Sequence, residues 1–258
     1  MKGRSQSSSI PTKRSSGQAR SRQNVESWNV KRAVAELQRF GEKRNIEGMA
    51  RFGIRAKRVL GVSKPRMDEL ARKIGRNHTL ALQLWKTGIH DARILAGMVA
   101  EKERVTAALM DRWVKCFDNW DICDGTCCHL FVFAEPAWVK ALAWSGRKKE
   151  FEKRAGFALA AYLAVHDKAA PDAAFQEYLK VIEREAGDER NFVRKAVNWA
   201  LRNIGKRNIK LNREAIRVTE KLRQRDSRAA RWIAADALRE LRSAAVQRRL
   251  QAKEELDR

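Results

Sequence analysis

The segment from Asp111 to Phe133 carries the side chains best suited to chemistry. It reads DRWVKCFDNWDICDGTCCHLFVF and holds all four cysteines together with several carboxylates and aromatic rings. Trp120 and Asp124 are four residues apart, so on a helix an indole and a carboxylate would share one face about one turn apart. An ionised carboxylate can stabilise a developing positive charge and accept a proton from water.

A second interpretation of Asp124 stays open at this point. Gly125 follows it, and Asp-Gly is also a turn or helix-end signal in which the carboxylate caps the next helix. Residue type alone favours the cap.

The cysteines of the same segment allow a metal site, a nucleophile or simple packing. Cys123, Cys127, Cys128 and His129 provide donor atoms, but Cys127 and Cys128 are adjacent and no CxxC pair occurs, which is poor spacing for zinc. Neighbours in sequence do not face each other on a helix, which disfavours a Cys/His nucleophile pair. Thiols that pack in a helical core are the favoured interpretation, and we expect neither a metal nor a cofactor.

The composition favours a polyanionic partner. Of 258 residues, 55 are Lys or Arg and 31 are Asp or Glu, a net charge of +24. Hydrophobic residues make up 44%, enough for a sizeable core. We expect no membrane span and no signal peptide, and the clustered cysteines favour a reducing compartment. The sequence therefore predicts a cytoplasmic protein, nucleoid-associated if the polyanion is DNA.

The charge and the apolar pattern divide the chain into three parts. Residues 1–24 hold six basic residues, seven serines and no acidic residue, which predicts a flexible basic tail. The rest holds 49 basic and 31 acidic residues, so a net +18 lies outside this tail. Residues 25–245 form one expected domain, and residues 246–258 form an expected polar C-terminal tail.

From residue 25 onward, apolar residues recur at helical spacing. Ser63 before Lys64-Pro65 predicts an N-cap, and the helix that follows ends at Gly75. About a dozen helices with short loops and no convincing strand predict an all-α, HEAT-like helical solenoid. A non-repeating helical bundle is the alternative. Further helices are expected over 78–85, 92–99, 105–117, 137–144, 151–165, 173–182, 192–204, 216–222 and 229–241.

Four stretches, in order along the chain, resemble the AlkD-like DNA alkylation repair family. They are GVSKPRMDELARKIG, LALQLWKTGIHDARILAGMV, WVKCFDNWDICD and NFVRKAVNWALRNIGK. The resemblance covers about residues 45–245. It implies a HEAT-like solenoid that acts as a DNA glycosylase on N3- and N7-alkylated purines, holds the duplex on a concave basic face and needs no enclosing base pocket.

The resemblance also implies roles for individual residues. The family's catalytic cleft of two Trp residues and one Asp corresponds to Trp120, Asp124 and Trp199. Its DNA-contacting arginines correspond to Arg202 and to Arg154, with the adjacent Lys153 as the alternative to Arg154. The residue types suit the chemistry: an alkylated purine is cationic and leaves without a general acid, a carboxylate stabilises the oxocarbenium-like sugar and orients water, and indoles add cation–π attraction.

Further basic residues predict contacts with the DNA backbone. Arg194, Lys195 and Lys206 share the stretch 192–206 with Arg202, and phosphate binding through them would be strongly salt-dependent. The other Trp residues are expected to serve the core or packing and not function. They are Trp28, Trp85, Trp113, Trp138, Trp144 and Trp232.

The sequence therefore predicts a monomeric, monofunctional DNA glycosylase that binds double-stranded DNA containing alkylated purines and no membrane. The main alternative is a non-catalytic HEAT-like module that binds damaged or branched DNA. A protein-interaction scaffold and an RNA-binding protein are further alternatives, although no aromatic motif of the RNP type is present.

Overall fold

The computed structural model describes residues 27–256. Within that range the regular secondary structure is helical, apart from one isolated β-bridge between Gly41 and Val62. The basic tail predicted for residues 1–24 lies outside the described residues. Two short 3-10 helices, Lys102–Arg104 and Phe131–Phe133, accompany the α-helices. The α-helices are α1 (Val30–Phe40), α2 (Lys43–Arg51), α3 (Lys64–Ile74), α4 (His78–Lys86), α5 (His90–Val99), α6 (Ala107–Val114), α7 (Trp120–His129), α8 (Ala137–Ser145), α9 (Glu150–His166), α10 (Asp172–Glu185), α11 (Asn191–Gly205), α12 (Ile209–Arg223), α13 (Arg228–Leu241) and α14 (Ala244–Leu256).

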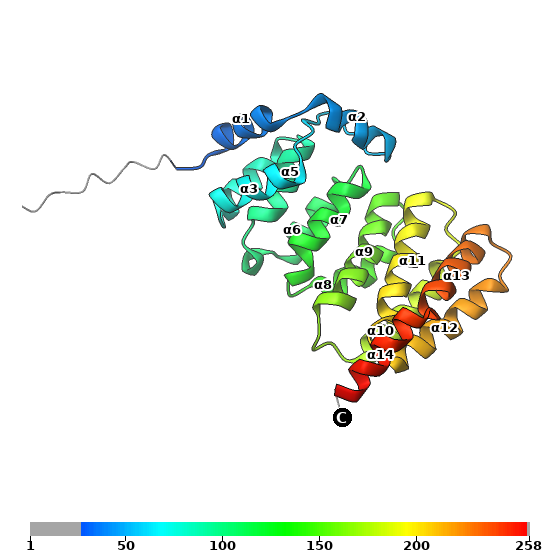
Figure 1. The fold of residues 1–258 in the computed structure, drawn as a ribbon. Coiled ribbons are helices and arrows are strands. Elements are labelled where there is room, and N and C mark those ends of the chain that lie inside the picture. Colours follow the sequence, from blue (N-terminus) through cyan, green and yellow to red (C-terminus); the bar gives the residue numbers. More distant parts are fainter. Residues whose placement is uncertain (1–26, 257–258) are drawn as a thin grey trace, which may run out of the picture.

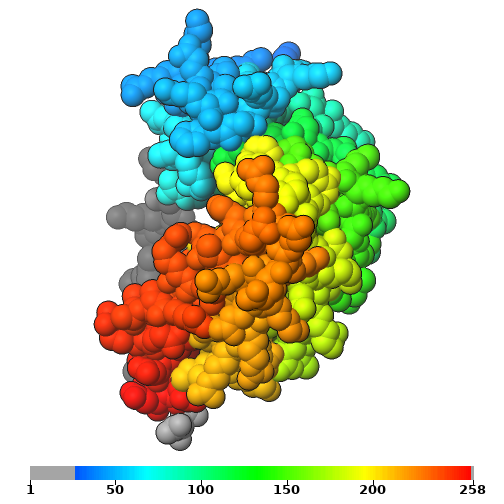
Figure 2. All heavy atoms as spheres, turned by 90° about the vertical axis from the view of Figure 1, so that its right-hand side faces the viewer, coloured from blue at the N-terminus to red at the C-terminus, as the bar shows by residue number. Residues whose placement is uncertain are grey.

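The helices form two rows, which makes the fold a HEAT-like stack of helical pairs. Helices α3, α5, α7, α9, α11 and α13 pack side by side in one row, which we call the inner row. Helices α8, α10 and α12 pack against each other and against the inner row from the other side. Figures 1 and 2 show the result as a stack that runs from the N-terminal helices in blue at one end to the C-terminal helices in red at the other.

The local signals in the sequence placed the helices well. The helix predicted after Ser63 is α3, with Ser63 in the N-cap position, Pro65 in the first turn and Gly75 at the C-cap with φ +72°. Helix α12 begins at Ile209, seven residues before its predicted start at Ile216, because Asn208 caps it by accepting a hydrogen bond from the backbone N–H of Leu211.

Most of the predicted core tryptophans are buried or partly buried. Trp85 and Trp113 stack with ring centroids 3.9 Å apart, and Trp144 is fully buried. Trp28 and Trp138 pack partly buried against the core. Trp232 is not a core residue but a packing residue at the surface: it is 37% exposed, and its ring lies on α13 under the guanidinium of Arg194.

The C-terminal segment differs from the polar tail that the sequence predicted. Helix α14 spans most of it, and Val246 and Leu250 bury their side chains against the end of the stack. Two apolar residues one helical turn apart are enough to dock a short helix when the last helical pair of the stack offers an apolar surface. No described helix is long and apolar enough to span a membrane.

Gly156 lets α9 approach α8 closely, and this contact yields a stability prediction. A Cβ at this position would lie 2.5 Å from the backbone nitrogen of Ser145 and 2.8 Å from the carbonyl oxygen of Ala141. Because backbone atoms cannot move aside cheaply, we expect Gly156→Ala to lower the free energy of unfolding by about 1–3 kcal/mol in urea denaturation. Gly146→Ala is the control, since a Cβ there meets nothing within 4 Å. An unchanged stability in Gly156→Ala would contradict the packing described.

Candidate active site

Helix α7 presents Trp120 and Asp124 one turn apart. Asn119 caps the helix by accepting hydrogen bonds from two backbone N–H groups of the first turn. Gly125 does not end the helix, and its lack of a side chain lets α5 approach, since a Cβ there would lie 3.2 Å from Cδ1 of Ile94. The interpretation of Asp124 as a cap is therefore wrong, because Asn119 holds that position and Asp124 lies within the helix.

The indole of Trp120 is fixed by the end of helix α2. Its Nε1 donates a hydrogen bond of 2.9 Å to the carbonyl oxygen of Phe52. The half-buried ring also lines a hollow of about 540 Å³ together with α2 and the segment that follows it. The side chain of Phe52 is 73% exposed beside this hollow. The indole of Trp120 is therefore held in one position between α2 and α7.

Arg154 of helix α9 holds the carboxylate of Asp124 in a bidentate ion pair. Nε donates to Oδ1 at 2.9 Å and Nη2 donates to Oδ2 at 2.6 Å. Nη1 donates to the carbonyl oxygen of Phe192 at 2.6 Å, so the guanidinium bridges α7, α9 and α11. The side chain of Arg154 is 8% exposed and that of Asp124 is 16% exposed. The carboxylate is therefore held rigidly but still reaches the surface.

The neighbouring Lys153 points elsewhere. Its Nζ lies 2.7 Å from a carboxylate oxygen of Glu185 and 2.9 Å from one of Asp188, in a separate cluster of charges. Of the two basic residues that the sequence could not separate, Arg154 is the one beside Asp124.

Burial and the ion pair act on Asp124 in opposite directions. Burial raises the pKa of its carboxyl above the ordinary value, and the Arg154 guanidinium offsets part of that rise. For Arg154, burial lowers the pKa, but the charge and the hydrogen bonds of Asp124, with smaller effects of Cys123 and Cys127, together outweigh it, so the pKa is raised. The pair therefore favours a charged guanidinium around a carboxylate that protonates more readily than an exposed aspartate.

Trp199 contacts Tyr162 of α9, and within residues 27–256 no ring contact joins it to Trp120. The rings of Trp199 and Tyr162 meet edge to face with centroids 4.9 Å apart, which places Trp199 of α11 against α9. Burial raises the pKa of the Tyr162 hydroxyl, and the nearby Cys128 and Asp124 raise it further. Asp124 and Cys128 are four residues apart on α7, so Tyr162 lies near the face of α7 that these two residues share. Sequence reasoning missed Tyr162, because nothing in its own segment sets it apart.

The cysteines of α7 pack against helix α9. The Sγ atoms of Cys123 and Cys127 are both buried, at 3.7 Å from the carbonyl oxygen of Phe151 and 3.8 Å from that of Ala155 respectively. The interpretation of these thiols as packing groups is confirmed for Cys123 and Cys127.

The basic residues predicted on α11 fall into different environments. Arg202 and Lys206 both form ion pairs with Glu240 of α13, and Arg202 also lies 3.4 Å from Asp236. The guanidinium of Arg194 lies over Trp232. Lys195 is exposed and forms no ion pair among residues 27–256.

Two hollows rich in basic residues lie at the C-terminal ends of the inner helices. One, of about 790 Å³, extends from α3 to α9 and includes Cys128. The other, of about 720 Å³, lies between α9, α11 and α14 and includes Lys206. Their cationic lining residues are Arg72, Arg76, Lys102, Lys168, Lys206, Arg207, Arg249 and Lys253, against one carboxylate, Asp68. The sequence analysis predicted Lys206 among these residues but not the others, because they come together from separate helix ends. Basic residues at helix C-termini also interact favourably with the helix dipole, so their presence there does not by itself indicate a binding site.

Paired helices in two rows with cationic hollows along the inner row define a HEAT-like repeat protein. The sequence model of the family described as "DNA alkylation repair enzyme" matches residues 33–241. The chain therefore belongs to the DNA alkylation repair enzyme family.

A solved structure has a similar fold. It is described as "a new family of proteins related to the HEAT-like repeat DNA glycosylases with affinity for branched DNA structures". Its TM-score is 0.70 at 21% sequence identity, and the match covers 83% of this chain and 96% of that chain. No curated protein sequence matches this chain significantly.

Proposed function

We propose that this protein is a monofunctional DNA glycosylase that removes N3- and N7-alkylated purines from duplex DNA by hydrolysing the N-glycosidic bond. The observation that carries the proposal is the Asp124 carboxylate, held by Arg154 one helical turn from Trp120. A site of this kind suits a reaction that builds positive charge on a sugar.

Asp124 would act on the sugar and on water, and the departing base would need no proton. An alkylated purine already carries a positive charge, so its bond to the sugar breaks without a general acid. A carboxylate has about four lone-pair positions, and the two bonds from Arg154 leave the others to face the oxocarbenium-like sugar or to accept a proton from water. Arg154 is then a positioning residue, because it orients the oxygen atoms that act.

The aromatic residues would form the walls around the cationic nucleotide. The indole of Trp120 is held at its edge by Phe52, and Trp199 is held against Tyr162. Indole faces attract cations by about 0.5–2 kcal/mol, more where water is excluded. These rings would favour the charged, alkylated base over an ordinary one.

The proposal is tested by incubating the protein with methylated duplex DNA and measuring free bases by chromatography. We expect release of 7-methylguanine or 3-methyladenine above the rate without protein, and no strand cleavage until the abasic sites are treated with alkali. If neither base is released at saturating protein, the proposal fails.

The pKa of Asp124 leads to a prediction about pH. Since burial raises this pKa, we expect the single-turnover excision rate to fall on the acid side through a pH above the ordinary aspartate value of about 3.9. The rate should be full where Asp124 is ionised and lost where it is protonated. The measurement is a pH profile at constant ionic strength, with the spontaneous rate subtracted. A rate that does not fall down to pH 4 would contradict it.

The alternative function is binding of branched or damaged DNA without cleavage of a bond. It is favoured by the affinity for branched DNA stated for the similar solved structure. Tight binding of a four-way junction by a protein that releases no base would support this alternative against the glycosylase.

A further inference from the structure

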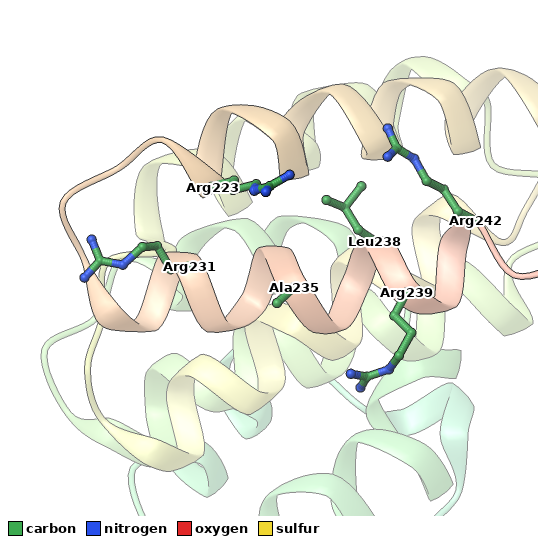
Figure 3. A pocket seen from close by; sticks show the side chains of 6 residues that line it. All are labelled: Arg223, Arg231, Ala235, Leu238, Arg239 and Arg242. Atoms are coloured by element: carbon green, nitrogen blue, oxygen red, sulfur yellow. The ribbon is translucent and has the colours of Figure 1, made fainter.

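The C-terminal end of the stack carries a trough lined by arginines. It lies between α12 and α13, encloses about 690 Å³, and is lined by Arg223, Arg231, Ala235, Leu238, Arg239 and Arg242. Figure 3 shows Leu238 and Arg242 pointing from α13 toward α12, while Arg223 lies along the gap and Arg239 points the other way. Small and apolar side chains thus form the floor, and guanidinium groups stand at both ends.

The trough is separate from the candidate active site. Trp232, Asp236 and Glu240 form the stripe of α13 that faces α11, through Arg194, Asn198 and the Arg202–Lys206 pair. The trough residues of α13 recur at 231, 235, 238 and 242, a different stripe of the same helix. It therefore opens at the end of the stack, on a side of α13 turned away from α11.

The trough keeps an excess of positive charge despite nearby carboxylates. Arg231, Arg239 and Arg242 have partners in Asp226, Asp236 and Glu220, and two of those carboxylates are largely exposed. Exposed pairs of this kind contribute little and can exchange one anion for another. Within residues 27–256, Arg223 has no ion-pair partner, and neither do the exposed Arg217 and Arg213, six and ten residues before it on α12.

The charge decides between the possible occupants. The N-terminal tail has six basic residues and no acidic one, so the trough would repel it. A second copy of this chain, with its own net charge of +24, would be repelled as well. Guanidinium groups match phosphate oxygens with two parallel hydrogen bonds, and the stripe along α13 is about 16 Å long, enough to follow several phosphates of one strand.

We propose that the arginine trough is a second DNA-binding surface that holds the backbone of a duplex other than the one at Asp124. One protein molecule then brings two duplex segments together, one along the inner row and one at the end of the stack. This inference goes beyond base excision and does not depend on it.

The test measures bridging between two short duplexes, one carrying a donor fluorophore and the other an acceptor. The full-length protein is titrated into the mixture at low salt, and energy transfer reports complexes that hold both duplexes. The trough variant is Arg223→Glu/Arg231→Glu. The control variant is Arg112→Glu/Lys115→Glu, which makes the same charge change at two exposed residues at the end of α6 that form no ion pair within 27–256.

We expect the wild-type protein and the control variant to bridge two duplexes. The trough variant should bind the second duplex at least about tenfold more weakly. For the second duplex, the slope of the logarithm of the binding constant against the logarithm of the salt concentration should become shallower by about 2, because two phosphate contacts are lost. Binding of the first duplex and release of methylated bases should not change, which separates this proposal from the proposed excision.

The proposal is overturned by a wild-type protein that binds only one duplex, by a trough variant that bridges as well as the wild type, or by an equal loss in the trough and control variants. Thermal unfolding of each variant verifies the fold, and the milder Arg223→Gln/Arg231→Gln variant should show a smaller loss in the same direction. Bridging of RNA duplexes but not of DNA would also count against it.

Discussion

Asp124→Asn is expected to slow the release of 7-methylguanine from methylated duplex DNA by about 10²- to 10³-fold, the usual effect of removing one preorganised electrostatic group from a reacting centre. The amide keeps the size of the carboxylate but loses its charge, so it neither stabilises the sugar cation nor accepts a proton from water. The affinity for undamaged duplex should stay within about threefold of wild type, because the cationic hollows along the inner row do not change.

Asp121→Asn is the matched control. It removes a carboxylate from the same helix, but the side chain of Asp121 faces His90, with the carboxylate 3.0 Å from Nε2, and lies away from Arg154. We expect it to excise at close to the wild-type rate. If both variants excise at the wild-type rate, Asp124 takes no part in the reaction. If both lose activity equally, the net charge of α7 matters and the position of the carboxylate does not.

Arg154→Met is expected to have the largest effect on stability. It leaves the Asp124 carboxylate without its partner in a site where both side chains are mostly buried, and breaking a buried pair in this way costs about 3–5 kcal/mol. The variant also gives up the bond from Nη1 to the carbonyl oxygen of Phe192, which links α9 to α11. The measurement is the free energy of unfolding in urea.

The double variant Asp124→Asn/Arg154→Met separates the charge from the packing. Since it leaves no unpaired buried charge, we expect it to be more stable than Arg154→Met alone. Arg112→Met, at an exposed arginine of α6, should change stability by less than about 0.5 kcal/mol. If the double variant loses the sum of the two single effects, the two side chains do not stabilise the fold as a pair.

The local pattern of the sequence predicted most helices because the signals for a helix are short in range. The Ser63-Lys64-Pro65 start and the Gly75 stop lie within the segment that they delimit. The helix α14 was missed because only Val246 and Leu250 bury themselves, and the value of two apolar residues depends on the surface offered to them.

The candidate site was predictable only in part, for the same reason. Trp120 and Asp124 lie four residues apart, so the geometry of one helix already places them together. Tyr162 became a neighbour of Trp199 only through the packing of α9 on α11. Its position could not be read from its own segment, where it stands among alanines and leucines.

The sequence by itself determined the all-helical fold, the spacing of Trp120 and Asp124, and the excess of positive charge. Only the tertiary structure decided that Arg154 and not Lys153 holds Asp124, from 30 residues away, and that Glu240 neutralises Arg202 from 38 residues away. The physical reason is that capping and four-residue spacing act within one helix. Partners across helices depend on how the neighbouring helices are rotated and shifted against each other, and the packing of the whole stack sets that register.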